Sequence, residues 1–441
     1  MTKPKTQSAP PTMRNTDTND ALANAMSIIN SLRQHGHETF LVGGCVRDRL
    51  LNRPPKDYDV TTQATPRQIK ALFPKAKLIG ASFAVMEYQQ IQIASFRKDG
   101  KYSDKRHPDN IDFGTIEEDA ARRDFTINAL YELPNPRNLA RPGRITDFFG
   151  GREDLRNRVL RTVGNPNARF REDALRLMRA VRFAARFNMT IAPQTLRAMT
   201  RHHRKLSMIS RERVRDEFLL IITGAQPTHA LDIIIKTKLL APICDNRTLA
   251  YLVRKNCARL TPLSKLLSAT TSTNNHQCLM IAALLADADR KRRTPQAAVE
   301  ALQKLRLANK QTKLITEILQ CLDQLRLPDH KTIAQHSARV IAAHPAAPLI
   351  LALARIIFKT KPNIKRNTNA INKWINTNQT RLPDPLITGN TLIRMGIKPA
   401  TSYATILSKI YNLQLDGKIN TADEARKTIA KIIVAQQKRN R

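Results

Sequence analysis

Strand-forming patterns in this 441-residue chain stop at about Arg169, and this asymmetry restricts the possible folds more than any other feature. Before that point, β-branched, aromatic or alternating runs predict short strands. These are Thr39–Val42, Tyr58–Val60, Lys77–Ile79, Phe83–Tyr88 and Ile91–Phe96. Helical patterns cover Asp20–Gln34 and Thr65–Phe73, the second with Thr65 as cap and Pro66 at its first position. The sequence therefore predicts an α+β region followed by a long, all-helical remainder.

The charge of the chain is strongly positive. Its 74 Lys and Arg residues against 36 Asp and Glu give a formal net charge of +38, which opposes compaction unless a polyanion binds it. Between Asp329 and Asp384 there is no acidic residue, but there are nine basic ones: Lys331, Arg339, Arg355, Lys359, Lys361, Lys365, Arg366, Lys373 and Arg381. This predicts a folded basic face for a nucleic-acid backbone, and a generally basic proteome is the alternative.

Several classes of protein are excluded by simple patterns. The apolar run Ala347–Ile357 is interrupted by Pro348 and Arg355 and is shorter than the about 20 residues that a membrane helix needs. The five cysteines are scattered without a CxxC pair, which argues against a disulfide scaffold and a cysteine zinc site. The polar segment Met1–Asn19 has no apolar core of a secretory signal. We expect a disordered leader at residues 1–19 and a cytoplasmic protein without membrane contact.

The first segment that suggests chemistry is Leu41-Val-Gly-Gly-Cys-Val-Arg-Asp48, a strand, a glycine pair and the start of a helix. Glycines let the backbone approach a phosphate closely. Gly44 lies in the turn, and Arg47 offers a bidentate phosphate donor. A plain structural turn is the alternative for this segment considered alone.

About ten residues later, Asp57 and Asp59 flank Tyr58 in an extended run. Residues i and i+2 of a strand point to the same face, so the two carboxylates lie side by side and repel each other. Divalent metal relieves that repulsion, and such a pair can hold two Mg²⁺ ions about 3.5–4 Å apart. About three acidic-x-acidic pairs are expected by chance in a chain of this composition, so the pair is informative mainly beside the glycine turn.

Two arginine-rich segments follow. Arg123, in the run Arg122-Arg-Asp124, is a candidate clamp for phosphates or ribose, although a solvated ion-pair cluster would look the same. Further along, Asp173, Arg176, Arg179 and Arg182 recur every three residues, which predicts that they share one side of a helix. The opposite side is apolar and predicted to be buried: Leu177, Ala180, Val181, Ala184 and Ala185.

An Asp–Arg pair on such a helix suits base recognition. The arginine donates to ring acceptors while the carboxylate accepts from an exocyclic amine, a combination that cytosine and adenine offer and guanine and uracil do not. We therefore hypothesise a template-free choice of C and A. An amphipathic helix with a solvated basic face is the alternative.

These four elements in this order resemble the class II nucleotidyltransferases of the polymerase-β superfamily, namely CCA-adding enzymes and bacterial poly(A) polymerases. The resemblance covers about residues 38–225, including the segment 97–108, and resumes at 385–399 and 414–421. It implies that Asp57 and Asp59 are catalytic and bind Mg²⁺. It also implies that Gly44, Arg47 and Arg123 bind nucleotide, that Asp173 and Arg176 read the base, and that Arg179 and Arg182 contact phosphates. It assigns no role to Asp124.

The resemblance also implies an architecture and partners. The expected fold is a nucleotidyltransferase head with a small mixed β-sheet, followed by helical neck, body and tail. The expected domains are a catalytic head at 20–150, a neck with the base-reading helix at 151–225, an RNA-binding body at 226–380 and a tRNA-binding tail at 381–441. The partners implied are tRNA, CTP and ATP.

Within the family, the motifs favour CCA addition to the 3′ end of tRNA, with release of pyrophosphate. The run Leu78–Met86 lacks the paired basic stretch ending in His that poly(A) polymerases favour, and Gly396–Pro399 and Gln414–Gly417 look like the CCA-adding branch. Poly(A) synthesis and an A-adding specialist stay open. A non-catalytic RNA binder would have no reason to keep both aspartates beside Arg123. The chain has no His-Asp dipeptide, so an added phosphohydrolase activity is not expected.

Overall fold

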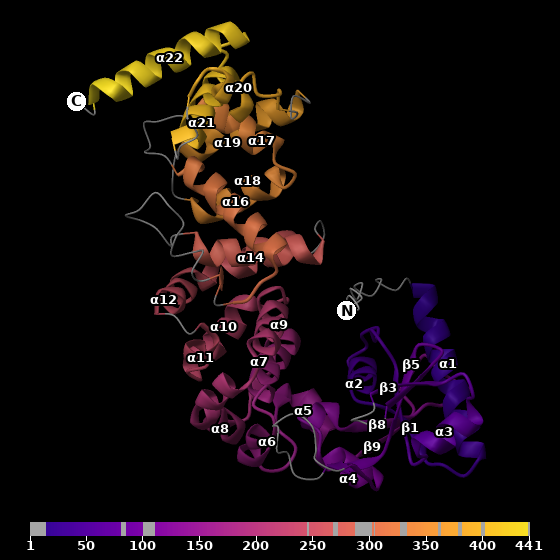
Figure 1. Cartoon of the computed structure of the whole chain (residues 1–441). Helices are drawn as coiled ribbons and strands as arrows, with labels where there is room; N and C mark the ends of the chain where they lie inside the picture. Colours follow the sequence, from indigo (N-terminus) through magenta and orange to yellow (C-terminus); the bar gives the residue numbers. More distant parts are fainter. Residues whose placement is uncertain are drawn as a thin grey trace. The chain divides into compact units, whose positions relative to one another are not determined.

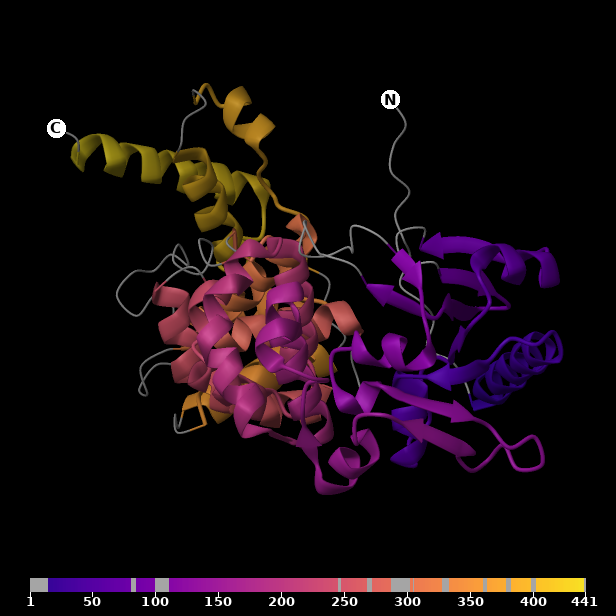
Figure 2. The same cartoon turned by 90° about the horizontal axis from the view of Figure 1, so that it is seen from below.

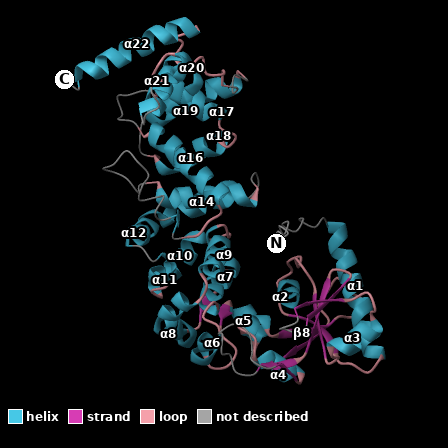
Figure 3. Ribbon diagram, viewed as in Figure 1, coloured by secondary structure: helices cyan, strands magenta, loops and turns pink. Residues whose placement is uncertain are grey.

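A computed structural model describes residues 15–80, 85–99, 111–244, 247–267, 272–286, 302–303, 305–326, 333–359, 363–377, 382–397 and 402–439. The chain divides into two compact units, Met1–Asp245 and Asn246–Arg441 (Figure 1). Among the described residues, strands occur only in the first unit (Figure 3). The expected α+β class, with a helical remainder, is confirmed.

A seven-stranded mixed sheet organises the head. Its strand order is β3-β4-β5-β2-β1-β8-β9, and β2 and β5 are its only parallel neighbours. The strands of the first unit are β1 (Thr39–Val42), β2 (Asp59–Thr62), β3 (Lys77–Gly80), β4 (Val85–Tyr88), β5 (Ile91–Ser95), β6 (Arg97–Asp99), β7 (Ile111–Phe113), β8 (Leu130–Leu133), β9 (Arg144–Asp147), β10 (Val159–Leu160) and β11 (Thr190–Ile191). All four residues of β1 are buried, so the sheet is centred on β1 and its neighbours.

Five of these strands lie where the sequence predicts them, with ends shifted by one or two residues. Residues 83–84 of the predicted fourth strand lie outside the described residues. The expectation that no strand follows Arg169 is wrong, because one short strand lies beyond it. Thr190 and Ile191 form β11, which pairs in parallel with β10, a pairing too short to leave a periodic pattern.

The helices of the first unit are α1 (Asn15–Gln34), α2 (Gly44–Leu50), α3 (Pro66–Leu72), α4 (Ile116–Ala121), α5 (Gly151–Asn157), α6 (Pro166–Glu172), α7 (Arg176–Phe187), α8 (Pro193–His202), α9 (Arg211–Ile222), α10 (Pro227–Lys236) and α11 (Leu240–Cys244). Helix α1 packs against β1, β2 and β5 (Figure 2). It begins at Asn15, inside the predicted leader 1–19. Helix α3 starts with the predicted Thr65 cap, and Gln68 completes a capping box.

The second unit is built of the helices α12 (Arg247–Asn256), α13 (Leu260–Leu267), α14 (Thr273–Leu285), α16 (Asn309–Leu325), α17 (Gln335–Ala343), α18 (Ala347–Ile357), α19 (Asn363–Asn376), α20 (Gly389–Arg394), α21 (Ser402–Leu415) and α22 (Ala422–Arg439). A separate apolar cluster, which includes Leu392, Ile410 and Ile429, lies within the predicted tail. The finer division into head, neck, body and tail stays a prediction.

The basic segment between Asp329 and Asp384 lies in the second unit, and most of its described cations are exposed. Five of the nine predicted basic residues are exposed: Arg355, Lys359, Lys365, Arg366 and Lys373. Arg339 instead lies over the ring of Trp374, 4.7 Å from its centroid. The other three, Lys331, Lys361 and Arg381, lie outside the described residues.

No single helix in the described part of the chain is long and apolar enough to cross a membrane. Helices α17 and α18 meet the length and composition criteria only as a pair, and they are bent by 118° relative to each other.

Candidate active site

The carboxylate pair lies at the start of a central strand. Asp59 is the first residue of β2, next to β5 and β1 in the sheet, and Asp57 lies two residues before it. Asp57 is exposed and Asp59 is half-buried. Burial and the negative charge of Asp57 raise the pKa of the Asp59 carboxyl to about 6, while Arg123 partly opposes that shift. The site therefore carries negative charge that a cation would stabilise.

At this site, Asp57 and Asp59 are the candidate ligands for a metal ion. No group of three or more His, Cys, Asp or Glu side chains among them is placed to hold a metal ion. Two adjacent carboxylates nevertheless fit a divalent cation, because an ion that binds oxygen ligands relieves their mutual repulsion. Further ligands would come from water or from a bound phosphate.

The glycine turn comes close to an arginine. Gly43 has φ +73°, its N–H donates to the carbonyl of Leu130 (3.1 Å), and a Cβ on it would lie 3.3 Å from Nη1 of Arg123. The residue that requires glycine is thus Gly43, whereas the residue predicted from the sequence to bind nucleotide is Gly44. At Gly44, an added Cβ would be in ordinary contact, 3.7 Å from Nη2 of Arg47.

Two buried side chains, Asp119 and Tyr131, hold the guanidinium of Arg123 in place. Its Nη2 donates to Oδ2 of Asp119 (3.0 Å), and its Nε donates to the Tyr131 hydroxyl (3.2 Å). Tyr131 in turn donates to the same Asp119 oxygen (2.7 Å). Burial opposes ionisation of Asp119, but Arg123 and Arg122 outweigh it and lower its pKa to about 2. Arg123 therefore has a fixed counter-ion that orients it beside the glycine turn.

Arg47 is buried and does not face solvent. Its Nη1 donates to Oδ1 of Asn128 (2.5 Å), and its Nη2 forms an ion pair with Asp48 (2.7 Å). Its guanidinium lies over the rings of Phe187 and Phe183, at 4.4 Å and 5.3 Å from their centroids. In this arrangement Arg47 links α2 to α7.

Asn128 extends this contact to Asp124. Its Nδ2 donates to Oδ1 of Asp124 (3.0 Å), and Nε of Arg179 donates to the other Asp124 oxygen (2.8 Å). Burial raises the pKa of Asp124, but Arg179 and Asn128 outweigh it, so the net pKa is lowered. Asp124, for which the sequence suggests no role, is thus the carboxylate that anchors Arg179 to the head.

The predicted base-reading helix is interrupted. Asp173 is the C-cap of α6 with extended backbone (φ −139°), and α7 begins only at Arg176. The expectation that Asp173 lies on one helix with the three arginines is therefore wrong. The reason is local, since Oδ1 of Asp173 accepts the N–H of Leu175 (2.9 Å) and turns the chain. The apolar side is buried as predicted: Leu177, Ala180, Val181, Ala184 and Ala185.

Asp173 and Arg176 are not paired with each other. Arg176 donates to Oε2 of Glu172 (2.6 Å) and to the carbonyl of Arg122 (3.1 Å). Oδ2 of Asp173 accepts from Nη2 of Arg213 (3.3 Å) on α9.

Arg182 is paired in the same way with α9. Its Nε donates to Oε2 of Glu217 (2.7 Å). Arg213 and Glu217 are not predicted from the sequence, in which the only local signal for them is their place on an amphipathic helix.

Known proteins resemble this chain in sequence. Residues 39–161 match the family described as "Poly A polymerase head domain", and residues 188–246 match that described as "Probable RNA and SrmB- binding site of polymerase A". The CCA-adding enzyme of Anoxybacillus flavithermus is 39% identical over 228 residues, which are 51% of this chain and 56% of that protein. Poly(A) polymerase I of Salmonella typhi is 41% identical over 219 residues, 46% of each chain. The chain thus spans about half the length of these relatives.

The resemblance in fold extends further. The crystal structure of the Bacillus stearothermophilus CCA-adding enzyme in complex with CTP is similar with a TM-score of 0.70 and 26% identity. The structural alignment covers 95% of this chain and 99% of the Bacillus stearothermophilus chain. Both units of the chain therefore have counterparts in that structure.

Proposed function

Because the chain belongs to the class II family of CCA-adding enzymes and bacterial poly(A) polymerases, we propose that it adds CCA to the 3′ end of tRNA from CTP and ATP, with release of pyrophosphate. The observation that carries the proposal is the pair Asp57 and Asp59 at the start of β2, next to an arginine held beside a glycine turn. The similarity to a CCA-adding enzyme over nearly the whole chain supports this activity over poly(A) synthesis.

In the proposed reaction, Asp57 and Asp59 hold divalent metal, for which we propose Mg²⁺. When bound, the metal lowers the pKa of the attacking 3′-hydroxyl and neutralises the leaving pyrophosphate. Arg123, oriented by Asp119, contacts the phosphates or ribose of the incoming nucleotide. The Gly43-Gly44 turn lets a phosphate approach the backbone closely. Arg47 acts from a buried position, and its contacts with Asn128 and Phe187 favour a supporting role behind the nucleotide.

For base choice, we propose that Asp173 accepts from the exocyclic amine of C or A while Arg176 donates to the ring acceptors. Arg213 already donates to the Asp173 carboxylate and orients it. Arg179 and Arg182 would exchange their carboxylate partners for phosphate oxygens of the nucleotide.

The RNA is proposed to be tRNA, held in part by the exposed cations of the second unit, among them Arg355, Lys365 and Lys373. Because tRNA is the proposed substrate, we also propose a cytoplasmic location. Neutralising these three residues together should weaken tRNA binding. The slope of log affinity against log salt concentration should become shallower by about three.

The test is incorporation of nucleotides into a tRNA transcript that ends at its discriminator base, followed on a gel. CTP alone should add two residues, and CTP with ATP should add three. A long ladder from ATP alone would instead identify a poly(A) polymerase, which the similarity to the Salmonella typhi protein keeps as the second candidate. A single A, added only to a transcript ending in CC, would identify an A-adding specialist.

Variants connect the reaction to the site. Asp57→Asn and Asp59→Asn should each abolish incorporation while tRNA binding is kept. Asp112→Asn, at an exposed position of β7, is the matched control and should stay active. Full activity of Asp59→Asn would refute the assignment of the carboxylate pair.

A further inference from the structure

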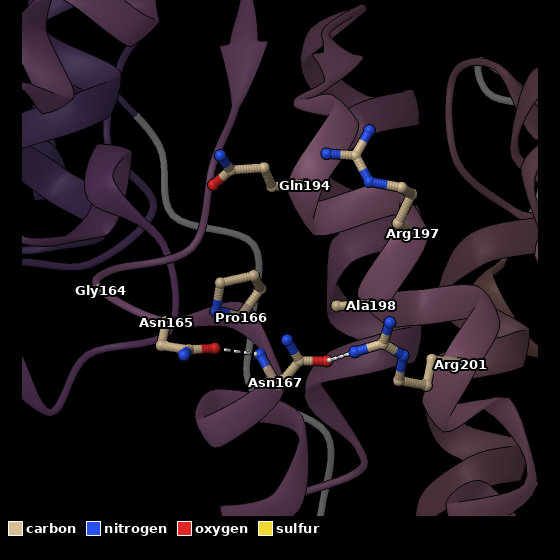
Figure 4. Close-up of a pocket in the computed structure, with 8 residues that line it drawn as sticks. All are labelled: Gly164, Asn165, Pro166, Asn167, Gln194, Arg197, Ala198 and Arg201. Carbon is tan, nitrogen blue, oxygen red and sulfur yellow. Dashed lines mark hydrogen bonds between the residues drawn. The ribbon is translucent and has the colours of Figure 1, made fainter.

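A cavity lined by both polar and apolar residues opens at the N-terminal end of α8, on the first unit. It has a volume of about 770 Å³ and adjoins a second one of about 310 Å³. The two share four lining residues: Gly164, Pro166, Gln194 and Arg197. Neither cavity is lined by any of the residues predicted to bind nucleotide or metal. Figure 4 shows the smaller cavity, with Gln194, Arg197 and Arg201 on α8 and Asn165 and Asn167 across from them.

The walls of both cavities carry positive charge. Arg197 is exposed, and its side chain makes no hydrogen bond or ion pair within the described part of the chain. Among the described residues, the hydrogen-bond partner of Arg201 is Oδ1 of Asn167 (3.4 Å), a neutral group. Arg161 lines the larger cavity and shares its charge with Asp154 (3.0 Å). None of the described residues that line either cavity is Asp or Glu, so an anion is the favoured occupant.

The backbone adds unpaired donors at the same place. The cap residue of α8, Ala192, offers no side-chain hydrogen bond, and Pro193 has no N–H. The N–H groups of Gln194 and Thr195, at the positive end of the helix, have no described acceptor. Thr162 lines the larger cavity and is 2% exposed, and its hydroxyl has no hydrogen-bond partner among the described residues. Phosphate oxygens satisfy donors of this kind.

An aromatic side chain in the larger cavity favours a nucleotide, with its base, over a simple anion as the occupant. Phe148 lines the larger cavity and is 37% exposed. An exposed ring beside cations is the arrangement on which bases of single-stranded nucleic acid stack. Helix α8 also lies within residues 188–246, the region that matches an RNA-binding family description.

We propose that this cavity binds one phosphate, with its base, of the substrate RNA strand, at a position separate from the site of nucleotide addition. The proposal rests on the proposed function, because it takes the bound strand to be the RNA that is extended. Arg197 and the N-terminus of α8 bind the phosphate, and Phe148 stacks on the base.

The experiment uses the full chain and a fluorescein-labelled tRNA transcript that ends at the discriminator base. Binding is measured by fluorescence anisotropy over a series of salt concentrations. Arg197→Gln should weaken binding about tenfold and reduce the salt slope by about one. Phe148→Leu, which stays apolar, should weaken binding at least about fivefold with little change in the slope. Arg204→Gln is the matched control, since Arg204 is exposed in the 3-10 helix His203–Met208 that follows α8 and lines neither cavity.

Steady-state kinetics test whether Arg197→Gln affects binding of the RNA or binding of the nucleotide. Arg197→Gln should raise KM for the transcript and leave KM for CTP unchanged. Equal affinities of Arg197→Gln and Arg204→Gln for RNA would overturn the proposal, and so would an increase in KM for CTP alone. If the wild type binds RNA but incorporates nothing, the proposed function fails, while the binding comparison still decides whether the cavity holds RNA.

Discussion

Replacing Asp59 by Asn should stabilise the metal-free protein, and the effect should depend on pH. Burial and the charge of Asp57 raise the pKa of Asp59 from 3.8 to about 6. A rise of this size corresponds to about 3 kcal/mol. Because Asp59 is half-buried and solvent screens part of the interaction, we expect about 1–3 kcal/mol.

The sign follows from proton linkage. Between pH 4 and 6 the folded protein binds the Asp59 proton more tightly than the unfolded chain does, so the free energy of unfolding falls as the pH rises. The loss of stability caused by ionisation of Asp59 is small at pH 4 and complete above about pH 7. Asn carries no charge at any pH and avoids the penalty. At pH 8 in EDTA, Asp59→Asn should therefore unfold about 2–10 °C above wild type.

Differential scanning calorimetry at pH 4 to 8 measures this difference, with Asp112→Asn as the control for loss of an exposed charge. The difference between Asp59→Asn and wild type should increase with pH, while that of Asp112→Asn should not. Mg²⁺ should then raise Tm of wild type and not of Asp59→Asn. A Tm difference independent of pH, or a Mg²⁺ response kept by Asp59→Asn, would refute this reasoning.

Three more substitutions test contacts around the site. Gly43→Ala places a Cβ on a residue with φ +73°, 3.3 Å from Arg123, so it should cost about 1–2 kcal/mol in urea unfolding and raise KM for CTP. Asn128→Ala removes the amide that bridges an arginine to a buried carboxylate, and Tm should fall as expected for a loss of about 1–3 kcal/mol. Arg213→Gln removes the charged partner of Asp173, so the ratio of kcat/KM for CTP over UTP should fall about tenfold; an increase in that ratio would show that Arg213 only competes with the base.

The parts of the head that the sequence predicts are those with local signals. Thr65 caps α3 within its own turn, and the residues of β1 alternate or branch as a buried strand requires. Strand β8 escaped prediction because Glu132 lies in its middle and looks solvent-exposed in a sequence. In the structure it is fully buried, since Arg49 reaches it with Nε at 3.0 Å from Oε2. A partner 83 residues away leaves no local pattern.

The same limit applies to the candidate site. The aspartate pair and the glycine turn are short motifs that the sequence displays directly. What each arginine contacts depends on tertiary structure, as in the bond between Arg179 and Asp124 or that between Arg213 and Asp173. The break in the predicted helix at Asp173 was also hidden, because the three-residue spacing continues across it while the backbone does not.

The arrangement of arginines suggests how the net charge of +38 is divided between nucleotide and RNA. In the first unit, the arginines predicted to bind nucleotide each have an acidic partner: Arg123 with Asp119, Arg176 with Glu172, Arg179 with Asp124 and Arg182 with Glu217. A nucleotide must compete with these carboxylates, so its binding gains orientation more than net charge attraction. Within the described part of the chain, Arg197, Arg355, Lys365 and Lys373 are exposed and form no ion pair with a carboxylate, and a long polyanion gains most from cations that are not already neutralised. Under the proposed function, the surplus charge is therefore best suited to holding the RNA, and the paired arginines to positioning the nucleotide that would be added to it.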